Sequence, residues 1–252
     1  MKFFPILCLM MLLFTACGNP PEDTRAVPIL MYHDITDTSS ANNAFTVPLD
    51  RFDAHLAALS DAGYTSVTFA DLIDFVYFGG ELPEYPVLIT SDDGYTNIIT
   101  FAAPAASRYG MTVSCAVIGC LSGVNNHFSL NGDLPSNMEI ISHTFALHDR
   151  TLTFAPDLGT YEQLLTDDFR KMCDRYASRF PQTAAVLVYP HGAYSAESER
   201  ILHQLGIPVT VTCDPGVAVI EKGRPESLYA LPRISVWKDM EAKELLDRMR
   251  IE

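Results

Sequence analysis

The sequence predicts one α/β domain, a distorted (β/α) barrel of about seven parallel strands. Short apolar runs typical of buried strands alternate along the chain with amphipathic stretches of helical period. The length of 252 residues suits a single barrel. Several apolar runs end in acidic residues or histidines, as strands do at the carboxyl-terminal mouth of a parallel barrel, where its chemistry takes place.

The first predicted strand covers 27–32, an apolar run that ends at His33. A helix is expected over 50–62, because three apolar residues recur there at helical spacing before Gly63. The other predicted strands are short apolar runs at 66–69, 86–89, 112–118, 139–142, 184–189, 208–213 and 231–236. The other predicted helices lie between them, at 70–78, 97–109 (with a kink at Pro104), 161–180, 196–205 and 239–249.

The composition describes a globular protein with a large core, since 48% of its residues are hydrophobic and 19% are charged. The formal net charge of −14 argues against nucleic acid as a partner, because phosphate binding requires a basic face. The same charge disfavours electrostatic adhesion to anionic lipid or anionic wall polymers. A neutral substrate, or one whose product is cationic, is compatible with this surface.

The N-terminus indicates an exported protein. Lys2 precedes an apolar run over 3–14 that is too short to span a bilayer and typical of a signal peptide. The following Thr15-Ala16-Cys17-Gly18 resembles a bacterial lipoprotein cleavage box with Cys17 as the lipidated residue. This interpretation makes 1–16 the signal peptide, 17–26 a tether and 27–252 the domain, anchored by lipid to the membrane and facing the outside or the periplasm. The alternative is an ordinary secretory signal cleaved near Ala16.

Four cysteines remain in the body of the chain, at positions 115, 120, 173 and 213. Outside the cytoplasm they could form two disulfides in any of three connectivities. None has the CxxC spacing of a zinc cluster or a redox motif. Buried free thiols are the favoured interpretation.

The most informative stretch is Thr90-Ser91-Asp92-Asp93-Gly94-Tyr95, where two adjacent carboxylates follow a buried apolar run. Like charges this close repel unless a cation neutralises one of them, so the pair predicts a metal ion and further ligands. Polar residues also follow other predicted strands, at His33, His143 and 189–192. Because strand ends converge at the mouth of a barrel, these residues can share one site.

The chain resembles the polysaccharide deacetylases of carbohydrate esterase family 4, which have a NodB-like domain. The resemblance extends from Val27 to Val236, almost the whole mature chain. It is carried by three ordered motifs, Thr90-Ser91-Asp92-Asp93-Gly94-Tyr95, Ser142-His143-Thr144-Phe145-Ala146-Leu147-His148 and Tyr189-Pro190-His191-Gly192. The five-residue spacing of its histidine pair resembles the branch that contains biofilm poly-N-acetylglucosamine deacetylases.

The resemblance implies a divalent metal, Zn²⁺ first and Co²⁺ or Ni²⁺ next, held by Asp93, His143 and His148. One carboxylate oxygen and two imidazole nitrogens suit these ions and leave positions open for water and substrate. Asp92 is then the general base, and by resemblance to the same branch His33 is the general acid. Substrate contacts are expected from Tyr95, Tyr189, Pro190, His191, Gly192 and Arg233.

Two departures from the family pattern bear on these roles. On a regular helix five residues turn about 500°, which would leave the rings of His143 and His148 about 140° apart, so a loop is expected there. The family's third motif often carries an arginine where this chain has Val188. Arg233 is a possible substitute that would orient the base, and the alternative is a surface arginine or one that braces a loop. Asp34 could orient His33 or cap the following turn.

The predicted function is hydrolysis of N-acetyl groups on an extracellular or cell-wall aminoglycan, an N-acetylglucosamine polymer. The expected partner is an acetylated polysaccharide or peptidoglycan, with the membrane contacted only through the lipid anchor and the protein a monomer. One alternative is a glycan-binding lipoprotein of the same fold with impaired catalysis. Another is an O-acetyl polysaccharide esterase, because the same attack by water cleaves esters.

Overall fold

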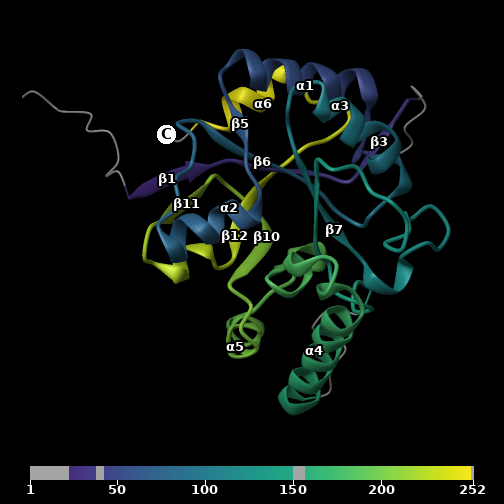
Figure 1. Ribbon diagram of the computed structural model, residues 1–252, viewed down its shortest axis with the longest axis vertical. Coiled ribbons are helices and arrows are strands. Elements are labelled where there is room, and N and C mark those ends of the chain that lie inside the picture. Colours follow the sequence, from purple (N-terminus) through teal and green to yellow (C-terminus); the bar gives the residue numbers. More distant parts are fainter. Residues whose placement is uncertain (1–22, 38–42, 150–156, 251–252) are drawn as a thin grey trace, which may run out of the picture.

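The computed structural model describes residues 23–37, 43–149 and 157–250, and its centre is a closed barrel of seven parallel strands (Figure 1). The strands are joined in the order β2, β12, β10, β9, β8, β7, β6, and β6 pairs back with β2. Their bounds are Ile29–Tyr32 (β2), Pro86–Ser91 (β6), Val113–Val117 (β7), Met138–Ser142 (β8), Val186–Val188 (β9), Val209–Pro215 (β10) and Leu231–Ser235 (β12). The fold class predicted from the sequence is confirmed.

The register of the barrel brings the predicted site residues to one mouth. In β6 every residue is buried, as expected for a parallel strand covered on both faces. Tyr32 at the end of β2 pairs with Ser91 at the end of β6, so His33 and Asp92 leave the sheet side by side. On the other edge of β2, Met31 pairs with Ser235 of β12.

Five short strands complete the sheet structure around the barrel. β1 (Thr24–Val27) pairs antiparallel with β11 (Ala218–Glu221), β3 (Asp34–Thr36) pairs with β4 (Thr46–Pro48), and β5 (Thr65–Ser66) adds to the edge of β6. The pairing of β1 corrects the domain boundary, because Thr24 to Ala26 belong to the folded domain and not to a tether. Cys17 and the predicted signal peptide lie outside the described residues.

Two groups of helices cover the barrel (Figure 1), since α1, α3 and α6 pack together and α4 lies beside α5, while α2 lies apart from both groups. Their bounds are Leu49–Asp61 (α1), Phe69–Ile73 (α2), Ala103–Ser107 (α3), Leu158–Met172 (α4), Ala196–Gln204 (α5) and Ala242–Arg248 (α6). Wider π-helical turns adjoin three of them, at Asp74–Phe78 (η1), Ile98–Ala102 (η2) and Cys173–Ala177 (η5). Shorter 3₁₀ turns lie at Gly119–Leu121 (η3), Pro181–Ala184 (η6), Pro190–Gly192 (η7) and Pro225–Leu228 (η8).

Two local expectations need correction. The predicted strand at 66–69 ends early, because Thr68 caps α2 in a reciprocal capping box with Asp71 and turns the chain into a helix. The helix predicted at 97–109 does not simply kink at Pro104. Pro104 lies in the first turn of α3, where a missing N–H costs little, and η2 precedes it.

The four cysteines of the described chain are free. Cys115 is buried, Cys173 and Cys213 are half-buried, and Cys120 is exposed, so the expectation of buried thiols is wrong for Cys120. Across the described residues, no helix combines the length and apolar character needed to cross a bilayer.

His55 of α1 lies fully buried between this helix and the barrel. Its Nδ1 accepts a hydrogen bond from the Tyr32 hydroxyl at 3.0 Å, and its Nε2–H donates to the Met240 carbonyl at 2.8 Å. The ring is therefore a neutral structural element that ties β2 and α1 to the segment before α6. Burial lowers the pKa of His55, although the Met240 carbonyl favours the protonated ring.

The lowered pKa of His55 predicts a loss of stability in acid. Below about pH 6.5 the unfolded chain binds a proton at this histidine that the folded chain resists, so the free energy of unfolding falls with pH by up to about 1.4 kcal/mol per pH unit. The measurement is urea unfolding from pH 8 to pH 5, with His55→Gln expected to show a smaller slope than wild type. Equal slopes would contradict this role.

Candidate active site

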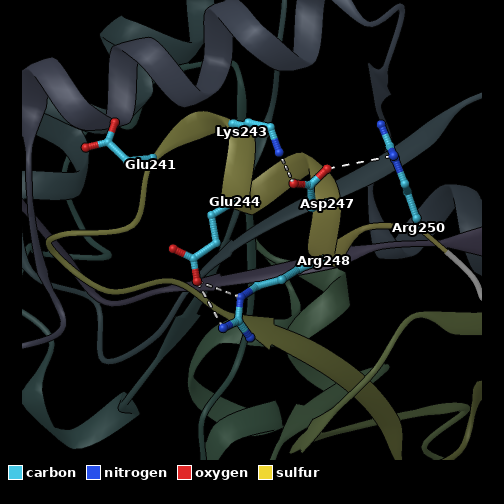
Figure 2. Close-up of a pocket in the computed structure, with 6 residues that line it drawn as sticks. All are labelled: Glu241, Lys243, Glu244, Asp247, Arg248 and Arg250. Atoms are coloured by element: carbon cyan, nitrogen blue, oxygen red, sulfur yellow. Dashed lines mark hydrogen bonds and ion pairs between the residues drawn. The ribbon is translucent and has the colours of Figure 1, made fainter.

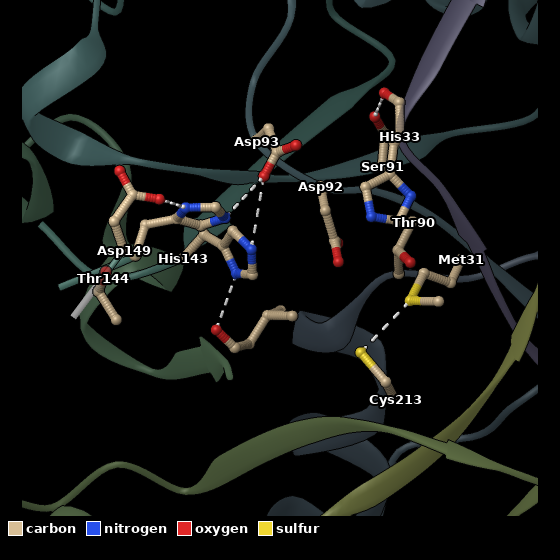
Figure 3. A network of polar contacts seen from close by, with 12 residues as sticks. Met31, His33, Thr90, Ser91, Asp92, Asp93, His143, Thr144, Asp149 and Cys213 are labelled. Atoms are coloured by element: carbon tan, nitrogen blue, oxygen red, sulfur yellow. Dashed lines mark hydrogen bonds and ion pairs between the residues drawn. The ribbon is translucent and has the colours of Figure 1, made fainter. Parts of the chain in front are cut away.

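The two adjacent aspartates after β6 point in different directions because the backbone turns sharply between them. Asp93 has a φ of 73° and Gly94 a φ of 86°, so two successive residues adopt the left-handed conformation. A side chain at Gly94 would approach Val117 within 3.2 Å. Figure 3 shows the result, with Asp93 directed toward the histidines and Asp92 lying between Asp93 and His33.

Asp93, His143 and His148 form a group that could hold a metal ion. Their candidate ligand atoms all lie within 4.8 Å of one another. Asp93 Oδ1 lies 3.6 Å from His143 Nε2 and 3.2 Å from His148 Nε2. A group of two imidazoles and one carboxylate at a solvent-accessible mouth fits an ion such as Zn²⁺ with positions left open. The structure thus brings together the three ligands expected from the sequence.

Hydrogen bonds on the far side of each ring favour the tautomer that metal binding requires. His143 Nδ1 lies 2.9 Å from the Val188 carbonyl, and His148 Nδ1 lies 3.0 Å from Asp149 Oδ1. Both partners are acceptors, so Nδ1 carries the proton and Nε2 keeps its lone pair facing Asp93. Burial lowers the pKa of His143, whereas Asp93, which would accept a hydrogen bond from Nε2 of the protonated ring, raises the pKa of His148.

The histidine motif is a loop, as the five-residue spacing requires. Thr144 has a φ of 69°, which turns the chain directly after His143, and its hydroxyl accepts a hydrogen bond from the Leu147 amide at 3.2 Å. This left-handed threonine is a strained conformation that surrounding contacts must hold. The expectation that both rings reach one position from an irregular segment is confirmed.

Asp168 of α4 holds this loop in place, and the sequence analysis missed it. Its carboxylate accepts the backbone amides of Phe145 at 2.6 Å and Ala146 at 2.7 Å, and only 5% of the residue is exposed. Burial raises the pKa of Asp168, although the two amides favour the charged form. The available signal was its position between Leu165 and Met172, because an acid on the buried stripe of a helix needs partners.

Asp92 is buried and paired with Arg233. Two parallel hydrogen bonds of 2.8 Å and 2.7 Å join the guanidinium to the two carboxylate oxygens. Burial opposes ionisation of Asp92, but the charge and hydrogen bonds of Arg233 outweigh it and hold the pKa well below its usual range. Asp92 therefore stays charged at neutral pH in a nearly water-free position.

Arg233 is not a substrate-binding residue, because none of its surface is exposed. Besides Asp92, its N–H groups reach the Thr212 carbonyl at 2.8 Å, the Thr90 hydroxyl at 3.1 Å and the Cys213 sulfur at 3.6 Å. Every N–H group of the Arg233 guanidinium therefore has an acceptor. An arginine on β12 thus takes the place of the one that the third motif lacks. Val188, which stands where the family has that arginine, contributes its backbone carbonyl to His143.

His33 follows β2 on the other side of Asp92 from the metal group (Figure 3). Its carbonyl accepts a hydrogen bond from the Ser91 hydroxyl at 2.8 Å, and its ring lies 5.0 Å from that of Phe45. Its buried Nδ1 has no hydrogen-bond partner within the described chain. Asp34 pairs instead with Asn97 and the Ile35 amide, so it does not orient His33.

The third motif contributes unevenly to the site. Tyr189 and Pro190 are buried. The Tyr189 hydroxyl donates a hydrogen bond to Glu199 at 2.6 Å, so the Tyr189 side chain points into the core. The Gly192 amide donates to the Tyr189 carbonyl at 3.0 Å and is no free oxyanion donor. Tyr189 and Pro190 are therefore shielded from a substrate, whereas the half-exposed Gly192 stays a predicted contact without a free amide. The ring of His191 is exposed and lies 4.9 Å from that of His148.

Tyr95 lies where the sequence predicted, next to the metal group. Its side chain contacts Asp93, and burial together with this carboxylate raises the pKa of Tyr95 to about 12. Its ring lies 5.2 Å from that of His127, which is half-buried. The hydroxyl thus stays neutral and can donate a hydrogen bond.

A surface hollow on α6 is a weaker candidate for a site (Figure 2). Its charged side chains pair with one another, for instance Lys243 with Asp247 at 2.6 Å and Arg248 with Glu244 at 3.0 Å. Exposed pairs one helical turn apart stabilise a helix by only about 0.3–0.5 kcal/mol. The hollow is therefore a solvated helix face.

Comparison with known proteins identifies the family. The family model described as polysaccharide deacetylase matches residues 79–210, more than half of the chain and including all three motifs. This chain belongs to the polysaccharide deacetylase family. It is a NodB-like hydrolase, and its relatives include proteins named poly-β-1,6-N-acetyl-D-glucosamine N-deacetylase.

Three similar proteins illustrate the range of the family. A Bacillus subtilis protein assigned as a polysaccharide deacetylase, YxkH, is 29% identical and aligns with 88% of this chain and 75% of its own length. The poly-β-1,6-N-acetyl-D-glucosamine N-deacetylase of Escherichia coli O157:H7 is 18% identical, and the alignment covers 97% of this chain and 44% of that protein. The solved structure of the Streptococcus pyogenes deacetylase PplD in complex with acetate is 26% identical, with a TM-score of 0.74 over 90% of this chain and 99% of that one.

In this member of the polysaccharide deacetylase family, the buried pair predicts an asymmetric response to mutation. Arg233→Met leaves the charge of Asp92 buried without a partner and should lower the free energy of unfolding by about 3–5 kcal/mol. The double variant Asp92→Asn/Arg233→Met removes both charges and should recover part of the loss, as measured by urea unfolding. A double variant no more stable than Arg233→Met would contradict the pairing.

Asp168 predicts a second effect, on the ligand loop. Asp168→Asn can accept only one of the two amides well, so we expect a loss of about 1–3 kcal/mol in stability and about 10–100-fold in metal affinity. Metal affinity is measured by competition with a chromophoric chelator. The adjacent Asp167→Asn is the matched control, because Asp167 is exposed on the same helix. Equal affinity in the two variants would rule out this role of Asp168.

Proposed function

We propose that this chain is a metal-dependent deacetylase that removes N-acetyl groups from an extracellular N-acetylglucosamine polymer. The observation that carries the proposal is the candidate metal group of Asp93, His143 and His148 beside the buried carboxylate Asp92. Ligands and base are separate residues here, as hydrolysis of an amide requires.

The donor set supports Zn²⁺ as the ion, with Co²⁺ or Ni²⁺ as alternatives. Two imidazole nitrogens and one carboxylate oxygen suit borderline ions better than Mg²⁺ or Ca²⁺, which prefer oxygen ligands alone. When bound, such an ion lowers the pKa of water toward about 7 and polarises a carbonyl.

Asp92 is placed to accept the proton of the attacking water. Arg233 occupies one direction at each carboxylate oxygen, and each oxygen keeps a second lone pair as an acceptor. Its low pKa keeps Asp92 in the charged form that a base needs. The bidentate pair also fixes the plane of the carboxylate, so Arg233 acts as a positioning residue.

His33 and Tyr95 complete the proposed chemistry. His33 lies across Asp92 from the metal group and would donate a proton to the leaving amine, a role suited to imidazole near neutral pH. The Tyr95 amide makes no hydrogen bond within the described chain, unlike that of Gly192, and is the favoured backbone donor to an oxyanion.

The substrate class rests on the family and on charge. A relative that aligns with 97% of this chain is named for poly-β-1,6-N-acetyl-D-glucosamine, and another deacetylase of this fold is known with acetate, the product of such a reaction. Deacetylation converts a neutral sugar into a cationic one, which the net charge of −14 tolerates. Lipidation at Cys17 would hold the domain at the membrane, outside the cytoplasm.

The two observations that suggested a glycan-binding protein without catalysis no longer favour it. These were the missing arginine and the stretched histidine pair. Arg233 contacts the base from another strand, and the loop at 143–148 brings both rings to Asp93. An O-acetyl esterase would use the same groups, so an assay with amide and ester substrates must distinguish the two activities.

The proposal is tested by acetate release from N-acetylglucosamine oligomers together with metal analysis. Asp92→Asn and His33→Ala should lose activity by about 10²–10⁴-fold while keeping the metal, because each removes a proton-transfer group. Asp93→Ala should lose both metal and activity. Chelation should abolish activity in the wild type, and Zn²⁺ should restore it.

Other outcomes would point elsewhere. Acetate release that survives both chelation and Asp92→Asn would overturn the mechanism. Glycan binding without turnover under several metals would favour the binding protein. Acetylated xylan as the sole substrate that yields acetate would favour the esterase.

A further inference from the structure

Phe45 is an exposed aromatic residue beside the proposed general acid. The residue is 40% exposed, and its ring centroid lies 5.0 Å from that of His33, with the two ring planes at 39°. Single exposed apolar side chains are common on protein surfaces, so exposure by itself indicates nothing. Phe45 is distinguished by its place, because His33 leaves the barrel beside Asp92 at the catalytic mouth (Figure 3). An aromatic ring is therefore available to a ligand at this edge of the active site.

The pairing of two short strands sets Phe45 next to His33. β3 and β4 pair in parallel with Asp34 opposite Thr46, so the residues that precede these two, His33 and Phe45, enter the pair side by side. The middle residue of each strand has no exposed surface, which anchors the pair in the core. The position of the aromatic ring beside the histidine thus follows from the sheet and not from a chance surface contact.

Hydrogen bonds fix the backbone on both sides of Phe45. Its amide donates to Asn43 Oδ1 at 3.0 Å, and the Thr46 amide donates to the Asn43 carbonyl at 3.2 Å. The amide of Lys238, which lies beyond the end of β12, donates to the Ala44 carbonyl at 2.8 Å. Because the backbone is already ordered, little conformational entropy would be lost when a ligand covers the Phe45 ring.

The proposed reaction requires a sugar ring at this position. To donate a proton, a nitrogen of the His33 ring must come within about 2.6–3.2 Å of the leaving amine. In an N-acetylhexosamine that amine is bonded directly to a carbon of the pyranose ring, so the sugar ring must lie close to His33. A pyranose carries C–H groups on its faces and hydroxyls mainly around its rim. A flat aromatic side chain can therefore cover one face and leave the hydroxyls in water.

We propose that Phe45 is a sugar-binding residue of the active site, and that its ring packs against the pyranose that carries the leaving amine. The proposal rests on the proposed function, because the role of His33 fixes where that amine must lie. An uncharged aromatic ring suits an uncharged N-acetylated sugar. Through this contact the enzyme selects acetyl groups that are carried on a sugar ring.

Calorimetric titration with β-1,6-linked and β-1,4-linked tetramers of N-acetylglucosamine tests the binding site. The full chain with Asp92→Asn is used, so that the sugar is not consumed during the titration. In this background Phe45→Ala should raise the Kd of the better-bound tetramer about 5–20-fold, whereas Phe45→Tyr keeps the aromatic ring and should stay within about two-fold.

Phe78→Ala is the matched control for loss of an exposed aromatic ring. Phe78 is 77% exposed at the end of η1, in the segment that leads to the amino-terminal end of β6 and not to the mouth. The Kd should be unchanged in this variant. Exposed residues such as Phe45 and Phe78 contribute little to folding, which a thermal melt of each variant checks.

The kinetic arm uses the same substitutions without Asp92→Asn. Phe45→Ala should raise the KM for acetate release about 5–20-fold and leave kcat within about two-fold, as expected when a binding contact is lost. A fall in kcat at constant KM would overturn the proposal, because it would show that Phe45 acts only through His33.

Two further outcomes would also overturn the proposal, namely equal Kd values in Phe45→Ala and Phe78→Ala, and a failure of both tetramers to bind. The proposed function can fail separately. If the tetramers bind and Phe45→Ala weakens them, but the wild type releases no acetate with any metal, the sugar-binding role of Phe45 stands and the proposed hydrolysis does not.

Discussion

The buried ion pair of Arg233 and Asp92 is the constraint on which the arrangement of the site depends. A guanidinium with no exposed surface must have every donor satisfied, and this one extends from β12 to groups on β10 and at the end of β6. Because these strands meet at one mouth of the barrel, the hydrogen bonds of Arg233 join them there. It also commits Asp92 to the interior, so that only Asp93, after the left-handed turn, faces the histidines.

Around this pair, residues that would not themselves contact a metal hold the candidate metal ligands in position. The Val188 carbonyl orients His143, Asp149 orients His148, and Asp168 holds the loop between the two histidines. Such outer contacts determine ring tautomer and direction, and their loss typically costs about 10–100-fold in metal affinity. The left-handed backbone at Asp93, Thr144 and His191 is strained and costs conformational free energy. The packing of the surrounding barrel holds these residues in that conformation.

The regular parts of the fold were predictable because their patterns are local. The helix at α1 and the buried strand β6 follow from apolar spacing and an apolar run, and both lie within a few residues of the predicted bounds. The strand predicted at 66–69 was wrong because the Thr68 capping box outweighed the β-branched residues around it. The pairing of β1 with β11 was missed because it joins segments almost the length of the chain apart.

By itself the sequence determined the barrel, the family motifs and the three candidate ligands, because strand ends of a parallel barrel converge whatever the details of packing. Only the tertiary structure decided how Asp92 is held. Arg233 lies 141 positions from it along the chain, and nothing in the local pattern of β12 distinguishes a buried ion pair from a surface arginine. The same holds for Asp168 and His55, whose partners are assembled only when distant segments pack and exclude water from their polar groups.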